Sequence, residues 1–441
     1  MIKTDYLIIG CGLYGSVLAE RISNILGKKV VILDKRNHIA GNCYSLKDGT
    51  TGIEYHKYGT HIFHTSSDIV WNYVNQFTAF NSYKHHLLTK YKNKIYQLPI
   101  NLDTINSYFN KNFNPDQAKK YIEKLARPYK KQENFNFEDK ALSQIGKELY
   151  QAFIKNYTTK QWGKDPKKLP STIFNRLPIR FNYNQNYQKT CKWQGIPKNG
   201  YTSFISNLLD NKKVNIHLNY NFSLFDKKFQ VKYLTIYTGP LDKLFNFKHD
   251  KLEWRSLKFE KKILHTSDYQ GNSVVNYPEL KYKFTRIHEP KHLHLERNYY
   301  NLKKTVIIKE FPVSDNNKPY YPINDIKNKN IQKMYVKSAE KLKTRQPMFF
   351  RLGLSKEWDD EAIIAVDLVT GFMNRFHSSS EWRLSIGAEI SRFKNQLFRM
   401  GFALGGIQKR TLSFGYGRNF GGLLFDIGIS LSGGFWLNST Q

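Results

Sequence analysis

The sequence predicts an α/β fold in which a Rossmann-like core carries an inserted helical domain and an antiparallel β-sheet domain, followed by extra C-terminal antiparallel β-hairpins. Three observations predict this fold: a strand–helix–strand pattern at the N-terminus, a long stretch of helical periodicity after it, and short β-branched strands beyond that stretch. At 441 residues the chain is long enough for two or three domains.

The N-terminal pattern is a βαβ unit. Residues 3–9 read as a strand, residues 12–26 repeat apolar side chains with a helical period, and KKVVILDK forms a second strand that ends in Asp34. These elements fill about 35 residues, the length that such a unit requires. We therefore expect the core to begin here.

The central part of the chain alternates between helical and strand patterns. Residues 65–160 are mainly helical, with a small hairpin at HLLTKYKNKIYQLPI, and residues 200–210 form another helix. Short strands follow at VNIHLNY, YLTIYTGP, SVVNYP and TVIIKEFP. This order predicts the inserted helical domain and the antiparallel sheet.

The sequence changes character near Lys343. Residues 1–343 contain 50 Lys and 8 Arg, whereas residues 344–441 contain 3 Lys and 8 Arg. The last 60 residues alternate apolar and polar side chains between Gly-rich turns. This pattern resembles the terminal hairpins of an outer-membrane β-barrel, although four or five strands cannot close a barrel.

Composition narrows the class of protein. The net charge of +33 comes mostly from Lys spread evenly along the chain, so it indicates compositional drift and not a nucleic-acid-binding patch. The three Cys show neither metal nor disulfide spacing, and His61 and His64 lack matching carboxylates, so we predict no metal site and a reducing compartment. We find no signal peptide and no apolar run of roughly 18 residues, so we expect a cytoplasmic protein whose residues 1–343 do not enter a membrane.

The spacing G-x-G-x-x-G in GCGLYG predicts a phosphate-binding turn. Gly10 permits the tight turn, Gly12 admits a pyrophosphate, and Gly15 lets the helix pack on the strand. Such glycine spacing also occurs in plain βα turns, but here a strand precedes it, a helix follows it, and Asp34 lies where it can bind ribose hydroxyls.

The residues after Asp34 favour FAD over NAD. A second glycine turn at Gly41–Asn42 fits a longer dinucleotide, and HKYGTHIFHTS adds a Gly-His turn that could line the flavin ring. The predicted cofactor-binding residues are Gly10, Gly12, Gly15, Asp34, Lys35, Gly41, Asn42 and His61.

Further motifs occur in a fixed order along residues 1–343: GCGLYGS, LDKRNHIAGNCY, HKYGTHIFHT, LPINLDTIN, IGKELYQAFIKNYTTKQWG, LPSTIFNRLPIRFNYNQNY, QGIPKNGYT, YTGPLD, WRSLKFE, FTRIHEPKH and KPYYPIND. Together they resemble bacterial UDP-galactopyranose mutase. The resemblance covers residues 1–343 and implies three parts: an FAD-binding βαβ core (residues 1–64), an inserted helical domain for substrate or dimer contacts (65–165), and an antiparallel sheet domain with returning core segments (166–343). The change in composition adds a fourth part, an atypical hairpin tail (344–441).

The resemblance implies a homodimeric isomerase that interconverts UDP-galactopyranose and UDP-galactofuranose for cell-envelope polysaccharide synthesis. The reaction requires FAD in its reduced form, since flavin N5 attacks the anomeric carbon and UDP leaves. The protein's task is then to position the reactants and to neutralise charge.

The resemblance also implies the residues that act. Arg176 in NRLP and Arg286 in FTRI match the arginines that bind the diphosphate and support catalysis, as guanidinium groups suit phosphate. The substrate-binding residues implied by the motifs are Phe153, Tyr157, Trp162, Arg176, Tyr187, Arg286, Tyr320 and Tyr321.

The chain departs from the family after MYVKSAEKLK. The family continues with a Gly-Arg-Leu segment and substrate-binding tyrosines, whereas this chain reads TRQPMFFRLGLSKEW. The sequence therefore leaves open the hypothesis that the enzyme has lost its activity with this segment. A chimeric, truncated reading frame with a barrel-type tail and no enzymatic function is one alternative, and a tail domain that mediates assembly is its rival. An FAD-dependent oxidoreductase of the amine-oxidase type is the other alternative.

Overall fold

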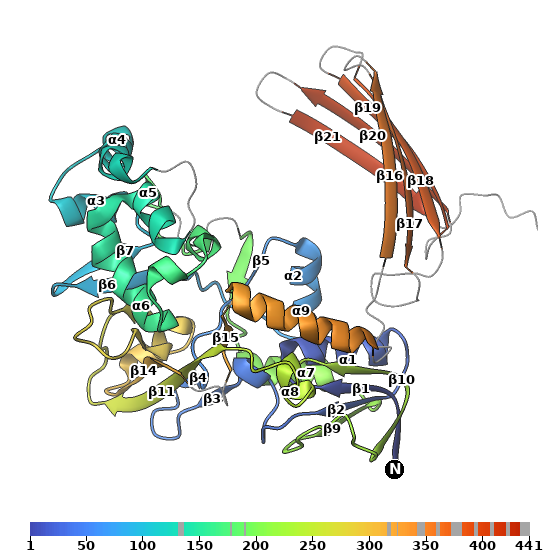
Figure 1. The fold of residues 1–441 in the computed structure, drawn as a ribbon, viewed down its shortest axis with the longest axis horizontal. Helices are drawn as coiled ribbons and strands as arrows, with labels where there is room; N and C mark the ends of the chain where they lie inside the picture. The colour runs from blue at the N-terminus through green and yellow to red at the C-terminus, as the bar shows by residue number, and fades with distance from the viewer. Residues whose placement is uncertain are drawn as a thin grey trace, which may run out of the picture. The chain divides into compact units, whose positions relative to one another are not determined.

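The computed structural model describes residues 1–130, 136–176, 179–188, 191–314, 319–323, 325–341, 349–358, 362–371, 382–391, 396–405, 410–419 and 424–432. The described chain forms two compact units, Met1–Tyr335 and Val336–Gln441. Figure 1 shows the helices and strands of each unit.

A four-stranded parallel sheet forms the Rossmann-like part of the first unit. Its strands lie in the order β10-β1-β2-β9, with β1 at Ile2–Ile9, β2 at Val30–Leu33, β9 at Val214–His217 and β10 at Phe229–Tyr237. The helix α1 (Leu13–Asn24) connects β1 to β2, which confirms the predicted βαβ unit. All four residues of β2 are buried, as expected for a central parallel strand.

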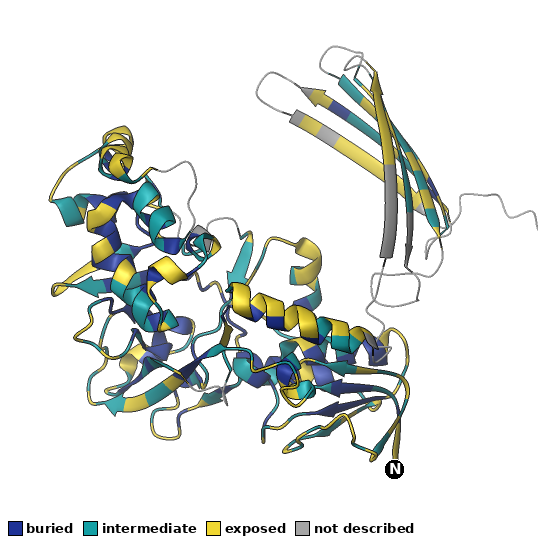
Figure 2. Cartoon of the chain, viewed as in Figure 1, coloured by how far each residue is buried: buried dark blue, intermediate teal, exposed yellow. Residues whose placement is uncertain are grey.

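Along the chain, the helical region lies between the strands β1 and β2 and the strands β9 and β10 of this sheet. It contains α3 (Leu102–Phe109), α4 (Pro115–Ala126), α5 (Phe137–Leu149) and α6 (Asn156–Trp162). Asn101 and Asn114 begin α3 and α4 with capping boxes, and a π-helical turn at Tyr150–Lys155 joins α5 to α6. Apolar side chains of these helices form a buried core (Figure 2).

A seven-stranded mixed sheet packs beside the helical region. Its order is β15-β11-β14-β13-β12-β6-β7. The bounds are β6 (Leu87–Tyr91), β7 (Lys94–Leu98), β11 (Trp254–Leu264), β12 (Val274–Asn276), β13 (Arg286–His288), β14 (Thr305–Val313) and β15 (Tyr321–Pro322). The predicted hairpin forms β6 and β7, and it joins the sheet through parallel pairing of β6 with β12.

The four short strands predicted after residue 210 divide between the two sheets. VNIHLNY and YLTIYTGP supply β9 and β10 of the parallel sheet, whereas SVVNYP and TVIIKEFP supply β12 and β14 of the mixed sheet. The other strands and helices of this part of the chain are β3 (Ser45–Lys47), β4 (Glu54–His56), β5 (Phe63–Thr65), β8 (Trp193–Gly195), α2 (Asp68–Val74), α7 (Gly200–Leu209), α8 (Leu241–Leu244) and the longer α9 (Ile326–Lys341).

The second unit contains a six-stranded antiparallel sheet whose strands follow one another in chain order, which confirms the predicted C-terminal hairpins. Along β19, Phe398, Met400 and Phe402 are 41–57% exposed on one face, whereas Ala403 is buried on the other. The strands are β16 (Phe349–Trp358), β17 (Ala362–Gly371), β18 (Arg383–Ile390), β19 (Gln396–Gly405), β20 (Arg410–Asn419) and β21 (Leu424–Ser432). Across the described ranges of both units, none of the helices has the length and apolar character needed to span a bilayer.

Candidate active site

The glycine-rich turn lies between β1 and α1, and two of its positions require glycine. Gly10 has φ +113°, and a Cβ on Gly15 would lie only 2.0 Å from the carbonyl oxygen of Gly10. A Cβ on Gly12 would meet only the Cα of Gly41, at 3.8 Å. Gly12 is also the N-cap of α1 and provides no side-chain cap, so the first N–H groups of this helix point toward a site suited to an anion.

Asp34 is fixed beside this turn at the end of β2. Its carboxylate accepts the backbone N–H of Cys11 at 2.8 Å and that of Arg36 at 2.8 Å. A cavity of about 240 Å³ opens here. Six of the eight predicted cofactor residues line it: Gly10, Gly12, Asp34, Lys35, Gly41 and Asn42.

The same cavity contains cations that the sequence analysis did not select. Arg36 donates to Asn42 Oδ1 at 2.7 Å and lies over the ring of Tyr58, and Lys243 lines the cavity from the segment after β10. A close backbone turn, a fixed carboxylate and nearby cations fit a dinucleotide with its pyrophosphate at the turn. Arg36 could have been selected because it follows the acid directly, but Lys243 has no local signal.

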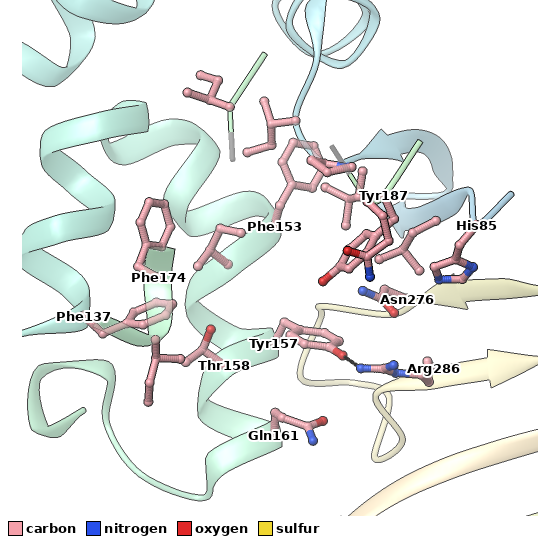
Figure 3. Close-up of a pocket in the computed structure, with 18 of the residues that line it drawn as sticks. His85, Phe137, Phe153, Tyr157, Thr158, Gln161, Phe174, Tyr187, Asn276 and Arg286 are labelled. Atoms are coloured by element: carbon pink, nitrogen blue, oxygen red, sulfur yellow. Dashed lines mark hydrogen bonds between the residues drawn. The ribbon is translucent and has the colours of Figure 1, made fainter. Parts of the chain in front are cut away.

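A second cavity, of about 420 Å³, lies between the helical region and the mixed sheet. Phe137, Phe153 and Phe174 form an apolar part, and Tyr157 points from α6 toward Arg286 on β13 (Figure 3). Six of the eight predicted substrate residues line this cavity: Phe153, Tyr157, Trp162, Tyr187, Arg286 and Tyr321.

Arg286 is the centre of a buried polar group. Its Nε lies 3.3 Å from Glu310 Oε1, and its terminal nitrogen donates to the hydroxyl of Tyr157. Burial is the largest single influence on Glu310 and opposes its ionisation, but the charge of Arg286 and the hydrogen bonds from His288 and Thr285 together outweigh burial, so the pKa of Glu310 lies below its usual value. Burial likewise raises the pKa of Tyr157. The cavity wall therefore holds a cation oriented by a carboxylate and a neutral phenol.

The cavity also brings together polar side chains that the sequence analysis missed. Burial lowers the pKa of His85 to about 3, so its imidazole is neutral. Asn276 Oδ1 and Gln161 Oε1 are buried and find no hydrogen-bond partner within the described parts of the chain. Unpaired buried acceptors of this kind suit the hydroxyl groups of a ligand. His85 and Asn276 follow no motif, because the fold alone places them beside Arg286.

Besides Gly15, which lies in the turn itself, three predicted residues do not join the linings of these cavities. Arg176 ends a short helical turn, and its side chain lies outside the described residues. Burial raises the pKa of Tyr320, and the positive charge of Arg36 opposes this effect, so Tyr320 lies near the first cavity. Its neighbour Tyr321 lines the second cavity. His61 lines neither cavity. Its Nδ1 is 2.8 Å from the carbonyl oxygen of Gly59.

Comparison with known proteins identifies the family of the chain. The model of a UDP-galactopyranose mutase family matches residues 152–354, and that of an NAD(P)-binding Rossmann-like domain matches residues 8–77. A probable UDP-galactopyranose mutase of Klebsiella pneumoniae is 38% identical over 377 residues, which cover 84% of this chain and 94% of the relative. The chain belongs to the UDP-galactopyranose mutase family.

Other members of this mutase family are also similar to the chain. A dTDP-fucopyranose mutase of Escherichia coli is 37% identical over 352 residues, covering 76% of this chain and 89% of the relative. A crystal structure of reduced UDP-galactopyranose mutase shares the fold, with a TM-score of 0.55 at 16% identity over 72% of this chain and 76% of that chain. The family match ends at residue 354, past the predicted boundary near Lys343.

Proposed function

We propose that the protein interconverts UDP-galactopyranose and UDP-galactofuranose with bound FAD in its reduced form. The observation that carries the proposal is the second cavity, where six of the eight residues implied by the family motifs come together. Family membership favours this isomerase over an oxidoreductase of the amine-oxidase type.

The residues of the second cavity have separate roles in this proposal. Arg286, with Arg176 as its predicted partner, binds the diphosphate and neutralises the charge that develops as UDP leaves. The apolar part near Phe153 takes the uracil, since aromatic rings offer it a stacking surface. Asn276 and Gln161 accept hydrogen bonds from the sugar, because their oxygens have no partner among the described residues.

The first cavity holds the cofactor in this proposal. Gly10, Gly12 and the start of α1 bind the pyrophosphate, Asp34 binds the ribose, and Arg36 supplies positive charge. When bound and reduced, FAD supplies a nucleophilic nitrogen for the anomeric carbon. His61 next to the flavin ring remains a prediction.

Purified protein tests the proposal directly. We expect a yellow protein with a flavin absorption spectrum that binds UDP. After dithionite reduction it should convert UDP-galactofuranose to UDP-galactopyranose, and chromatography of the nucleotide sugars measures this conversion. A well-folded protein that neither contains nor takes up FAD would contradict it.

The conversion of dTDP-fucopyranose to its furanose form is a second candidate, because identity to the E. coli enzyme is 37% against 38% for the K. pneumoniae protein. Turnover of both substrates by the same preparation separates the two. The higher kcat/KM identifies the natural substrate class.

We further infer that the protein acts as a cytoplasmic homodimer, and that residues 344–441 come from a fused reading frame that replaces the family's last motif. Sedimentation of the purified protein tests the dimer. The genomic sequence around codon 343 tests the fusion, since a continuous frame in independent isolates would favour an assembly domain.

A further inference from the structure

A chain of three hydrogen-bonded side chains starts at the wall of the second cavity. Thr60 lines this cavity, and its Oγ1 lies 2.8 Å from His288 Nδ1. His288 Nε2 lies 3.1 Å from Glu310 Oε2, and both of these side chains are only 3% exposed. The three residues come from the segment after β4, from β13 and from β14, so no local motif contains them.

The direction of each hydrogen bond follows from Glu310. Its carboxylate is ionised, because Arg286 and His288 hold its pKa below the usual value against the effect of burial. An ionised carboxylate only accepts, so His288 Nε2 must donate to it. With Nε2 as the donor to Glu310, Nδ1 of an uncharged imidazole accepts from the Thr60 hydroxyl, and Nδ1 of an imidazolium donates to it. The oxygen of Thr60 keeps its lone pairs for a further donor.

Among the described residues, the imidazoles that interact with His288 are held neutral by burial. His56, His61 and His85 each interact electrostatically with His288, and burial lowers the pKa of all three. Arg286 is the nearby cation, and Glu310 balances it. An imidazolium formed at His288 would therefore lie against a carboxylate, in the arrangement by which a carboxylate orients and stabilises a catalytic histidine.

We propose that Thr60, His288 and Glu310 form a proton relay that accepts and returns the proton of a sugar hydroxyl in the second cavity. The inference rests on the proposed function, because a pyranose and a furanose differ in which hydroxyl oxygen closes the ring. Thr60 is the group that touches the sugar. His288 acts through it, and Glu310 is the positioning residue.

The transfers balance in protons and electron pairs. When one ring opens, the bond between the anomeric carbon and the ring oxygen breaks, and the oxygen keeps that electron pair. The oxygen takes the Thr60 proton, and Thr60 Oγ1 takes a proton from the His288 imidazolium. When the other ring closes, the second hydroxyl oxygen gives an electron pair to the anomeric carbon, and the pair that bound flavin would supply on opening would return to it. The proton of that hydroxyl passes through Thr60 Oγ1 to His288 Nδ1, and Glu310 stabilises the imidazolium that is restored.

Two variants test the relay. Thr60→Val keeps the side-chain volume but removes the hydroxyl, and His288→Gln can still accept and donate hydrogen bonds but cannot take up a proton. We expect each to lower kcat by about 10²-fold or more, and Thr60→Ser to stay within about threefold of the parent protein. The dissociation constant of UDP, which lacks the sugar, should not change in Thr60→Val.

Thr159→Val is the matched control, because the Thr159 hydroxyl bonds the carbonyl oxygen of Lys155 on α6 and does not line the cavity. The relay is wrong if Thr60→Val and His288→Gln both fold, as followed by thermal unfolding, and both keep kcat within about threefold of the parent protein. If the parent protein itself shows no turnover and binds no UDP, the proposed function fails instead.

Discussion

Arg286 and Glu310 form a buried ion pair at the wall of the second cavity, with Arg286 Nε 3.3 Å from Glu310 Oε1. The Glu310 side chain is 3% exposed and that of Arg286 is 27% exposed, so the carboxylate is sealed while the guanidinium still reaches the cavity. The pair therefore presents a positive charge to a ligand and keeps the compensating negative charge out of its reach.

Substitution of Arg286 tests whether this guanidinium both binds the ligand and compensates the buried charge of Glu310. Arg286→Met should lower the free energy of unfolding by about 3 kcal/mol, because a buried carboxylate loses its main partner. The double variant Arg286→Met with Glu310→Gln should recover most of that loss in urea unfolding. Neither variant should bind UDP. Full UDP affinity in either variant would mean that another cation binds the diphosphate.

Two glycines of the phosphate turn can be compared with Gly49, a glycine between β3 and β4. Gly15→Ala should destabilise the fold and abolish flavin binding, since its Cβ would lie 2.0 Å from the Gly10 oxygen. Gly12→Ala should fold normally but bind FAD at least about tenfold more weakly, because its Cβ fits the protein but narrows the approach to the turn. Gly49→Ala is the control, since a Cβ there meets no atom within 4 Å. Flavin content and urea unfolding measure both effects, and equal FAD affinity in all three variants would contradict the assignment.

Lys160 joins α6 to the turn between β12 and β13. Its Nζ lies 2.5–3.0 Å from four backbone carbonyl oxygens, which share its three N–H donors: those of Tyr277, Glu279, Tyr282 and Phe284. Asn276 and Arg286 flank this turn, so the lysine holds the turn against the helix that carries Tyr157.

Lys160→Met should therefore lower the free energy of unfolding by about 2–4 kcal/mol, as several carbonyl groups lose their donor. The matched variant Lys155→Met, at an exposed position of the preceding turn, should stay within about 0.5 kcal/mol of the parent protein. Thermal or urea unfolding measures the difference. Equal stability of the two variants would show that water replaces the ammonium group at no cost.

The sequence predicted the parts of the site that depend on local chain geometry. Gly10, Gly12 and Asp34 belong to one βαβ unit, and the spacing of about 20 residues between turn and acid is enough to place them together. The family motifs then predicted Tyr157 and Arg286 as substrate-binding residues, and both line the second cavity. The second unit also followed from local alternation along its strands.

The remaining parts depend on contacts between distant segments. Short β-branched strands pair equally well in either sheet, so the sequence could not assign β9 and β10 to the parallel one. Thr60, His288 and Glu310 meet only because three strands or loops converge, and a lone histidine carries no signal of such a partner. Lys160 is one of 50 lysines in residues 1–343, and most of those that the structure describes are exposed, so its sequence position alone does not distinguish it.

The acid sensitivity of the fold provides the last prediction, and His85 is the group that tests it. Burial lowers the pKa of His85 to about 3, whereas the pKa of a histidine in an unfolded chain is about 6.5. Between these values the unfolded chain binds a proton that the folded protein does not bind. The free energy of unfolding should therefore fall as the pH is lowered from about 6.5 toward 3, and His56 and His61, whose pKa values burial also lowers, should add to the fall.

His85→Gln should reduce the slope of unfolding free energy against pH in that window by about 1.4 kcal/mol per pH unit, the contribution of one proton. Urea unfolding at several pH values between 4 and 7 measures the slope, and His265→Gln, at an exposed position, is the control that should leave it unchanged. An unchanged slope in His85→Gln would mean that His85 takes up its proton in the folded protein, and the neutral imidazole assigned to the cavity would then be wrong.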